Sequence, residues 1–313
     1  MLLDKLVLKH LKKRYNLCSG EILEYIKKRD GIECNKNKII NLFLGSSHTQ
    51  MGINSNAFEH NSAYNLAISS QDLYNSYELY KKYCKEIPNL KNIFIEYSVF
   101  SAGYEIEKSI NSRFAYYYNF VFGIPFKYST KSNFVKSNIN LVYKKAMNGY
   151  KLPKGYNGYL DYISYFDEIS AIKDIKAHIK HATRNNKQEL FIKKIIELAN
   201  SLGQNVYIII PPHSPAYRKH IKEEANKMGV SYENLFVPFD NLKNEINLKI
   251  LNYYDNKEFC DEDFYDWEHL NPSGALKLTS FIKSKMAEIG AAVERERERE
   301  RVIPLYKNKL KAA

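Results

Sequence analysis

The sequence predicts an α/β protein in which helices cover both faces of a parallel sheet. Short apolar runs of strand length recur along the chain, and segments with helical spacing separate them. Of the 313 residues, 44% are hydrophobic, which is enough for a large core. Because alternating strands and helices build parallel sheets, we expect a three-layer domain with an insertion.

Apolar segments along the chain are predicted to form the strands. The first, 39–44, is continuous and begins with β-branched residues, which is typical of a buried strand, and the turn Gly45-Ser46-Ser47-His48 follows it. The others are 64–68, 92–97, 206–210 and a short one, Leu235-Phe236-Val237. Because open α/β sheets keep their sites at the carboxyl ends of strands, the turn after the first strand is a candidate site.

Helices are predicted between and around these strands. They cover about 3–11, 21–28, 71–85, 191–202 and 216–228, and a last helix begins at Pro272. Asn271 can cap the last helix, and Pro272 stands where a missing N–H costs least. The start of this helix should therefore fix the preceding loop, which contains Asp266 and His269.

The chain divides into four parts. A helical segment, 1–37, precedes the α/β domain, which comprises 38–97 and 188–290. The insertion 98–187 is rich in Tyr and Phe; it is expected to be helical and to form a lid or acceptor-binding wall, or else a subdomain whose tyrosines pack its own small core. In 291–313, Glu and Arg alternate at first, which indicates a helical extension or a tail foreign to the natural chain.

The formal net charge is +12. This charge suits an anionic membrane surface or glycan, and equally a solvated surface dominated by Lys and Asn. The basic residues are dispersed and no nucleic-acid reading motif appears, so no nucleic-acid partner is expected. The basic amphipathic helix at 3–11 either packs on the domain or makes a peripheral membrane contact. Early charges leave no signal or spanning segment, and the four scattered cysteines suggest neither disulfides nor zinc, so we expect a cytoplasmic location, with or without membrane association.

Two distant stretches can supply a nucleophile and its base. Ser47 lies in the turn after the first strand, and Asp266 precedes His269 by three residues. A serine hydroxyl is a poor nucleophile until a base takes its proton, and an imidazole base needs a carboxylate to hold its tautomer. The sequence therefore predicts a catalytic set of Ser47, His269 and Asp266.

These two motifs resemble those of the SGNH, or GDSL-like, hydrolase superfamily, whose nucleophile follows a Gly-Asp-Ser turn and whose base lies in a C-terminal Asp-x-x-His. Ser47 and His269 match, and Ser46 replaces the Asp. The Gly-Ser-Ser form and the run 208–213 look most like the branch containing the D-alanine-transfer protein of lipoteichoic acid assembly and glycan O-acetylation proteins. The resemblance covers roughly 39–97 and 188–289 and implies a flavodoxin-like three-layer fold.

The superfamily usually supplies oxyanion donors from a Gly after the second strand and an Asn after the third. Here Ser69-Ser70-Gln71 and Tyr97-Ser98 stand near those places. The Ser47 N–H, a backbone N–H of Ser69 or Ser70, and the Gln71 amide are the candidate donors.

Three more side chains are candidates for substrate contact: His48, Tyr97 and His213. His48 and His213 can equally satisfy local hydrogen bonds. His178 and His181 are three residues apart, but no third ligand is evident, so no metal site is expected.

The predicted function is removal or transfer of a small acyl group, acetyl being the best fit, at a carbohydrate hydroxyl through an acyl-Ser47 intermediate. Hydrolysis needs no cofactor, whereas transfer needs acetyl-CoA or another acyl donor, for which no phosphate-binding Gly-rich loop is present. The alternative is an inactive fold that binds an anionic glycan or another polymer.

Overall fold

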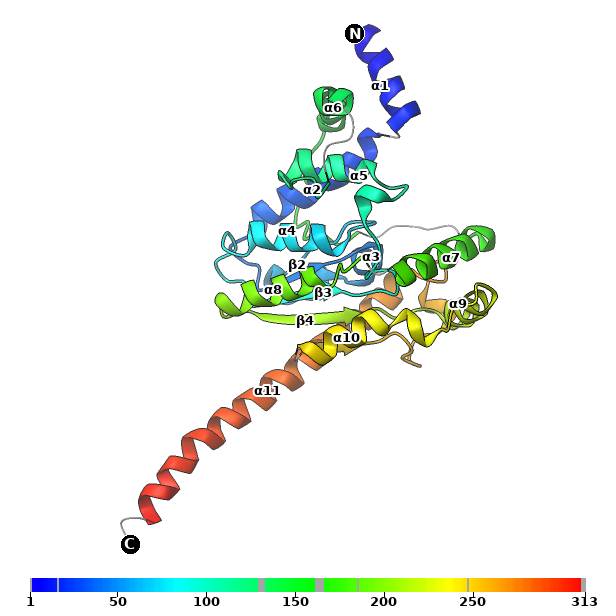
Figure 1. The fold of residues 1–313 in the computed structure, drawn as a ribbon. Helices are drawn as coiled ribbons and strands as arrows, with labels where there is room; N and C mark the ends of the chain where they lie inside the picture. Colours follow the sequence, from blue (N-terminus) through cyan, green and yellow to red (C-terminus); the bar gives the residue numbers. More distant parts are fainter. Residues whose placement is uncertain are drawn as a thin grey trace.

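The chain folds around a five-stranded parallel sheet with helices on both faces (Figure 1). The computed structural model describes residues 2–15, 17–128, 133–160, 166–184, 186–246 and 248–310. The strands are β1 Asn41–Leu44, β2 Ala63–Asn65, β3 Asn92–Glu96, β4 Asn205–Ile210 and β5 Lys249–Asn252. Their order is β2-β1-β3-β4-β5, the flavodoxin-like order, and this confirms the predicted fold class. β2 lies on one side of β1, and the later strands β3, β4 and β5 lie on the other. The strand order therefore reverses between β1 and β3, and a crevice opens at their carboxyl ends.

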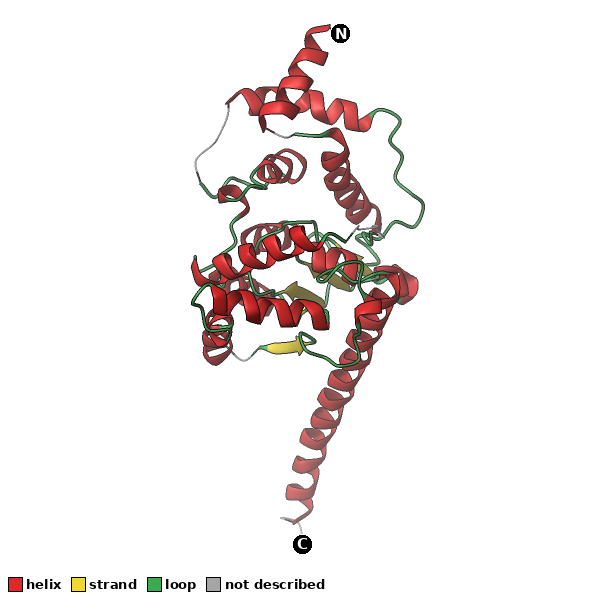
Figure 2. Cartoon of the chain, turned by 90° about the vertical axis from the view of Figure 1, so that its right-hand side faces the viewer, coloured by secondary structure: helices red, strands yellow, loops and turns green. Residues whose placement is uncertain are grey.

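Helices surround the sheet and form most of the segments outside it (Figures 1 and 2). They are α1 Leu2–Tyr15, α2 Ser19–Asn35, α3 Ser47–Gly52, α4 Leu73–Tyr83, α5 Arg113–Tyr117, α6 Asn133–Met147, α7 Glu168–Arg184, α8 Leu190–Ser201, α9 Pro215–Lys227, α10 Val237–Glu245 and α11 Pro272–Leu310. Short helical turns are η1 Ser55–Ala57, η2 Glu59–Asn61, η3 Ile106–Lys108, η4 Tyr118–Phe122, η5 Glu233–Leu235 and η6 Asp261–Asp263.

The predicted strand at 235–237 is wrong. Leu235 ends η5 and Val237 begins α10, because Pro238 lies in the first turn of that helix, where its missing N–H costs nothing. The strand that completes the sheet is β5. It has four residues, and Lys and Asn flank its apolar pair, so its sequence carries little strand signal.

Alternate side chains of the strands enter two separate cores. Leu42 and Leu44 of β1 point into the larger core, which contains α2, α4 and α8, whereas Phe43 points into the core beneath α11. There Phe43, Phe94 and Tyr207 stack in register, with ring centroids 4.4 and 4.8 Å apart. Residues of α11 close this smaller core, and the start of α11 is thereby held against the sheet.

The aromatic run of the insertion packs inside the protein. Tyr117 and Tyr118 are buried against Tyr25 of α2, with ring centroids 5.3 and 5.0 Å apart. These rings are core residues that join α2 to the insertion, so they do not provide the predicted aromatic wall for a sugar. Residues 129–132, 161–165 and 185 of the insertion lie outside the described residues.

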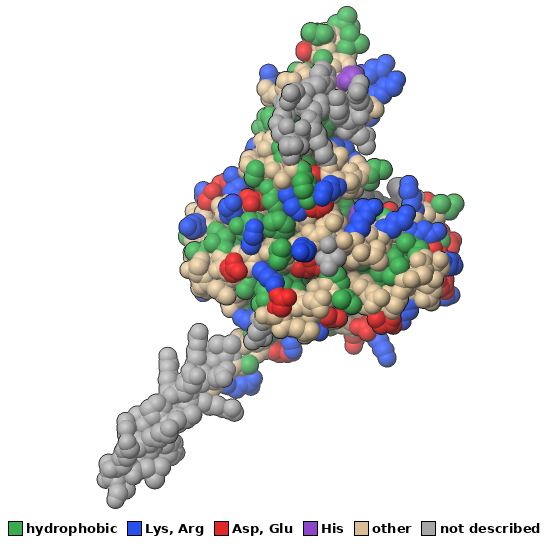
Figure 3. Space-filling model, in the orientation of Figure 1, with side chains coloured by type: hydrophobic (Ala, Val, Ile, Leu, Met, Phe, Trp, Pro, Cys, Tyr) green, Lys and Arg blue, Asp and Glu red, His purple; other side chains and the backbone are tan. Residues whose placement is uncertain are grey.

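The N-terminal helix is only partly packed. Leu11 is buried, but Leu2, Leu3 and Leu6 are exposed. Peripheral membrane contact through α1 stays a prediction. In the part of the chain that the structure describes, no helix combines the length and apolar character needed to cross a bilayer. Lys and Arg are interspersed with acidic side chains over the face in Figure 3 and do not gather in one patch.

Candidate active site

The turn after β1 places Ser47 at the first position of α3. Ser46 caps this helix: its backbone is extended, and its Oγ accepts a hydrogen bond from the His48 N–H at 3.4 Å. A Cβ added to Gly45 would lie 2.5 Å from the Cβ of Glu96, so only glycine fits where β1 passes the end of β3. Tight packing at the switch point of the sheet thus fixes the position of Ser47.

Glu96, the last residue of β3, holds this turn from below. Its buried carboxylate accepts hydrogen bonds from the Ser46 N–H at 2.8 Å, the Ser46 hydroxyl at 2.6 Å and the Thr49 N–H at 3.1 Å. The Ser98 hydroxyl donates another at 2.7 Å. Burial alone would raise the pKa of Glu96, but the hydrogen bond and charge of His48, with the bonds from Ser46 and Ser98, lower that pKa to about 2.

The structure brings Ser47, His269 and Asp266 together. The His269 Nε2 lies 2.8 Å from the Ser47 Oγ, and the His269 Nδ1 lies 2.9 Å from the Asp266 Oδ2. Burial alone would raise the pKa of Asp266, but the hydrogen bond and charge of His269 hold it well below its usual range. If the Nδ1–H donates to this carboxylate, the Nε2 lone pair faces the hydroxyl, as a general base requires.

The loop that carries the acid and the base is closed on itself. The Asp266 Oδ1 accepts hydrogen bonds from the backbone N–H groups of Glu268 at 2.8 Å and His269 at 2.7 Å. Asn271 then caps α11 by accepting a hydrogen bond from the Gly274 N–H at 3.0 Å. Hydrogen bonds from the neighbouring backbone therefore fix the orientation of the Asp266 carboxylate independently of its contact with the imidazole.

His48 lies beside this set but has different partners. It is buried, with its Nδ1 3.0 Å from the Ser98 Oγ and 3.4 Å from a Glu96 oxygen, and its Nε2 3.5 Å from a Glu268 oxygen. Burial alone would lower the pKa of His48, but Glu268 and Glu96 raise it to about 10. Its Nε2 forms no hydrogen bond among the described residues, and the ring lines the cavity next to Ser47, so the predicted substrate contact stays a prediction.

The predicted substrate contacts of Tyr97 and His213 are wrong. Tyr97 is 2% exposed and packs on Phe239, with ring centroids 4.6 Å apart. His213 is 1% exposed; its Nδ1 lies 3.2 Å from the Pro211 carbonyl, and its ring packs against Tyr217. Burial, followed by the charge of His48, lowers the pKa of His213 to about 3. Both residues follow strand ends, but the covering helices bury their side chains.

Backbone N–H groups near Ser47 can serve as oxyanion donors. The N–H groups of Ser47, Ser69 and Ser70 have no hydrogen-bond partner among the described residues. Ser70 has a φ of 60°, a left-handed conformation that glycine adopts more easily. The Ile68 N–H donates to the Gly45 carbonyl at 3.1 Å, so this loop is tied to the nucleophile turn.

Gln71, the remaining candidate donor, is occupied elsewhere. Its N–H donates to the Ile68 carbonyl at 2.9 Å, and its side-chain amide donates to the Ser76 hydroxyl at 2.9 Å. Its side-chain oxygen accepts a hydrogen bond from Tyr118 at 3.0 Å. Gln71 is buried in these contacts and does not join the candidate donors.

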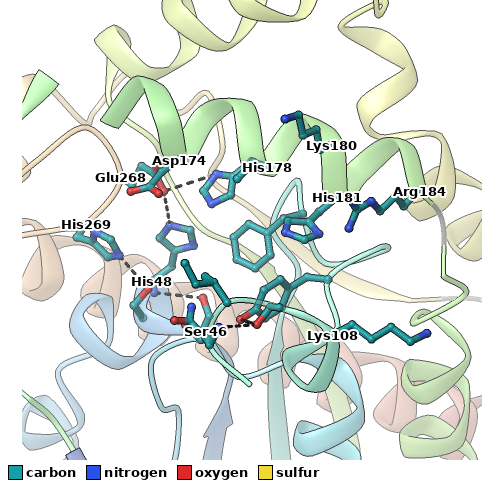
Figure 4. A pocket seen from close by; sticks show the side chains of 18 residues that line it. Ser46, His48, Lys108, Asp174, His178, Lys180, His181, Arg184, Glu268 and His269 are labelled. Carbon is teal, nitrogen blue, oxygen red and sulfur yellow. Dashed lines mark hydrogen bonds and ion pairs between the residues drawn. The ribbon is translucent and has the colours of Figure 1, made fainter. Parts of the chain in front are cut away.

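Two cavities meet at Ser47 and His269. The first, here called the α7 cavity, has a volume of about 440 Å³ and includes His48, Ser70, Phe100, Tyr104 and one face of α7 (Figure 4). The second, here called the α2 cavity, has a volume of about 470 Å³ and includes Glu21, Glu24, Gln50, Met51, Ser69, Phe114 and Leu160. Both volumes fall in the range of small-molecule sites, about 300–1,000 Å³.

Several residues of the site escaped the sequence analysis. Glu268 lies inside the second motif, but its partners come from elsewhere in the chain. Its carboxylate faces His48 and also His178 of α7, whose Nδ1 lies 3.6 Å from it. Glu96 had a signal, since an acid that ends an apolar strand must find partners. His178 was weighed only as a metal ligand, and nothing local showed that its ring would pack on Phe100, with centroids 4.6 Å apart, where the insertion folds back over the sheet.

Comparison with known proteins gives remote likenesses. No family profile matches the chain, and no curated protein sequence does. A structure named for an acylhydrolase from Bacteroides fragilis is 11% identical, with a TM-score of 0.38, and the match covers 80% of this chain and 86% of that one. A structure named for a platelet activating factor from Streptococcus pneumoniae is 13% identical, with a TM-score of 0.41 and coverages of 91% and 96%. A GDSL-like lipase from Bacteroides thetaiotaomicron is 12% identical, with a TM-score of 0.39 and coverages of 84% and 99%.

Proposed function

We propose that this protein is a serine enzyme of the SGNH type that removes or transfers a small acyl group through an acyl-Ser47 intermediate. The observation that carries the proposal is the continuous chain of contacts from the Ser47 Oγ through His269 to Asp266. Ser69 and Ser70, whose N–H groups have no partner among the described residues, line the cavities that include Ser47. A positioned hydroxyl, base and carboxylate are the requirements of acyl transfer.

In the first half of the reaction, the Ser47 Oγ attacks the ester carbonyl carbon, and its proton passes to the His269 Nε2. The N–H of Ser47, with that of Ser69 or Ser70, donates to the oxyanion. Collapse breaks the ester C–O bond, and the leaving alcohol takes the proton from the Nε2. In the second half, water or an acceptor hydroxyl attacks the acyl-Ser47, its proton passes to the Nε2, and the Ser47 oxygen leaves with that proton.

The proposed substrate is an acetyl ester of a carbohydrate. The α7 cavity has room for a sugar, and its lining supplies Tyr104, Ser109 and Asn111 as polar groups and Phe100 as an apolar surface. The resemblance to glycan O-acetylation proteins favours the same class. Hydrolysis would need no cofactor, whereas transfer would need acetyl-CoA or another acyl donor. We propose a cytoplasmic location, with the membrane contact of α1 as a further possibility to test.

A fluorophosphonate probe tests the acyl-enzyme. Labelling at Ser47 that disappears in Ser47→Ala and in heat-unfolded protein supports the enzyme. An unlabelled protein that cleaves no acetyl ester, but binds an anionic polymer in a salt-sensitive way, would support the inactive binding fold instead.

A second assay separates hydrolysis from transfer. The protein is incubated with a chromogenic acetyl ester, with and without candidate glycans, and the products are analysed by mass spectrometry. Acetyl groups on the glycan indicate transfer, whereas acetate alone indicates hydrolysis.

A further inference from the structure

One face of α7 forms a wall of the α7 cavity with a gradient of charge. Asp174, His178, His181 and Arg184 follow one another at spacings of four, three and three residues, so they lie along one side of the helix. Figure 4 shows Asp174 at the end of the cavity near Glu268 and His269, and Arg184 at the opposite end. With a rise of 1.5 Å per residue, about 15 Å of helix separates Asp174 from Arg184.

Cations collect at the end far from His269. Arg184 of α7 and Lys108 of η3 line the cavity there, and Lys180 also lines it, although its ammonium points away from the two histidines of α7 (Figure 4). Among the described residues, neither Lys180 nor Arg184 forms an ion pair. Lys108 pairs with Glu105 at 2.8 Å, but Glu105 also pairs with Lys127 at 2.6 Å, so one carboxylate serves two lysines. A net positive charge therefore remains at this end.

The histidines between the two ends do not add to this charge at neutral pH. Burial, followed by the charges of His178 and Arg184, lowers the pKa of His181 to about 4, and burial also lowers the pKa of His178. The cationic end is thus formed by Lys and Arg side chains, whose charge persists across the physiological range.

The α2 cavity lacks a comparable set of cations. It also reaches Ser47 and His269, but its described lining contains Glu21 and Glu24 and neither Lys nor Arg. Arg113 pairs with the Glu21 carboxylate at 3.0 and 3.2 Å, so the charge of Glu21 is balanced. Burial raises the pKa of Glu24, which weakens its negative charge. A negatively charged molecule that approaches Ser47 is therefore favoured on the α7 side, where cations line the cavity.

We propose that the far end of the α7 cavity is an anion subsite and that the substrate is the acyl ester of a negatively charged carbohydrate. This inference rests on the proposed function, which it deepens by specifying the substrate. The anion, a phosphate or a carboxylate, contacts Arg184 while the ester carbonyl lies at Ser47, and the nearby Lys180 and Lys108 add to the positive potential. Because most of the length of α7 separates these positions, at least one sugar ring stands between the anion and the ester.

Three acetylated substrates test the proposal: methyl glucoside, methyl glucoside 6-phosphate and methyl glucuronide. We expect kcat/KM to be at least about tenfold higher for an anionic ester than for the neutral one at low ionic strength, and the preference to shrink in high salt. A preference for the phosphate over the glucuronide identifies the anion as a phosphate, and the reverse preference identifies a carboxylate.

Two variants localise the effect. Arg184→Gln combined with Lys180→Gln should lower the ratio of kcat/KM for the anionic to the neutral ester about tenfold, the loss of a charged hydrogen bond. Lys173→Gln is the matched control: it removes a cation from the same helix, at a position outside the described lining of the cavity. Equal turnover of all three esters by the wild type, or an equal effect of the double and control variants, would overturn the subsite.

Calorimetry separates failure of the subsite from failure of the enzyme. If no ester is cleaved and Ser47 is not labelled, the proposed function fails. Binding of methyl glucoside 6-phosphate that is tighter than binding of methyl glucoside, and is weakened by Arg184→Gln, would still support the subsite. The absence of such a difference would refute it.

Discussion

His269 and His48 lie side by side, with ring centroids 5.1 Å apart, but their partners differ. His269 contacts one carboxylate, Asp266, and one hydroxyl, Ser47. His48 lies between two buried carboxylates, Glu96 and Glu268. An imidazole between two anions is held as a cation and has no lone pair to offer. An imidazole between an anion and a hydroxyl can take a proton and return it.

This difference assigns the two rings distinct roles. His269 is the candidate base, and it is partly exposed, with 23% of its side chain accessible to solvent. His48 is a positioning residue, because it links Glu96 beneath the nucleophile turn to Glu268 in the loop of the second motif. The same two residue types therefore build a reactive pair and a supporting ion network within one site. The following predictions test that division.

Ser47→Ala should produce the largest loss. Without the hydroxyl no acyl-enzyme forms, so kcat for ester hydrolysis should fall at least about 10³-fold. The control is Ser201→Ala, at the end of α8, where the exposed hydroxyl donates to the Leu198 carbonyl at 2.7 Å. Turnover of an acetyl ester by both purified variants provides the measurement, and substantial turnover by Ser47→Ala would remove Ser47 from the mechanism.

Asp266→Asn should lower kcat by about 10²–10⁴-fold while the protein stays folded. The amide no longer holds the tautomer of His269 that accepts the Ser47 proton. Steady-state kinetics and circular dichroism distinguish this loss from unfolding. If His48→Gln reduced kcat more than Asp266→Asn does, the roles assigned to the two rings would have to be exchanged.

Glu96→Gln should destabilise the fold by about 2–4 kcal/mol, because it leaves the cation of His48 with one carboxylate and replaces an acceptor by a donor. Glu288→Gln is the control. Its carboxylate is 61% exposed and pairs with Lys285, so we expect a change of less than about 1 kcal/mol. Urea unfolding at pH 6 measures both free energies. Equal urea midpoints for Glu96→Gln and the wild type would show that the network around Glu96 contributes no stability.

The smallest predicted effect, at most about 1.4 kcal/mol for each pH unit, is on the pH dependence of stability. The pKa of His48 is raised to about 10 from an ordinary value of 6.5, so the folded state binds more protons between these values. This contribution to stability is complete below pH 6.5 and is lost as the pH rises toward 10. The free energy of unfolding should therefore decline less steeply with pH in His48→Gln than in the wild type over this window.

His213 provides the contrast for this experiment. Its pKa is lowered to about 3, so the unfolded state binds more protons, and stability is lost as the pH falls from 6.5 toward 3. His213→Gln should change only this acid range. Identical alkaline slopes in the wild type and His48→Gln would contradict a buried cation at His48.

Some of the site was predictable because each part is local. Asp266 and His269 are three residues apart in the loop that precedes the cap of α11, and Ser47 follows an apolar strand. The partners of His48 were not predictable. They come from β3 and from the loop before α11, and nothing in the sequence near His48 indicates that both would supply a carboxylate. Tyr97 and His213 were misassigned for the related reason that a strand end does not specify which side chains the helices will bury.

The sequence by itself determined the alternation of strands and helices, the small turn at Ser47 and the spacing of Asp266 and His269. Short-range sterics, hydrogen bonds and periodic burial govern these features, and a few neighbouring residues are enough to encode them. Tertiary structure decided the fifth strand, the two carboxylate partners of His48 and the different charges of the two cavities. These depend on which distant side chains share a low-dielectric space, and only the packed fold brings them together.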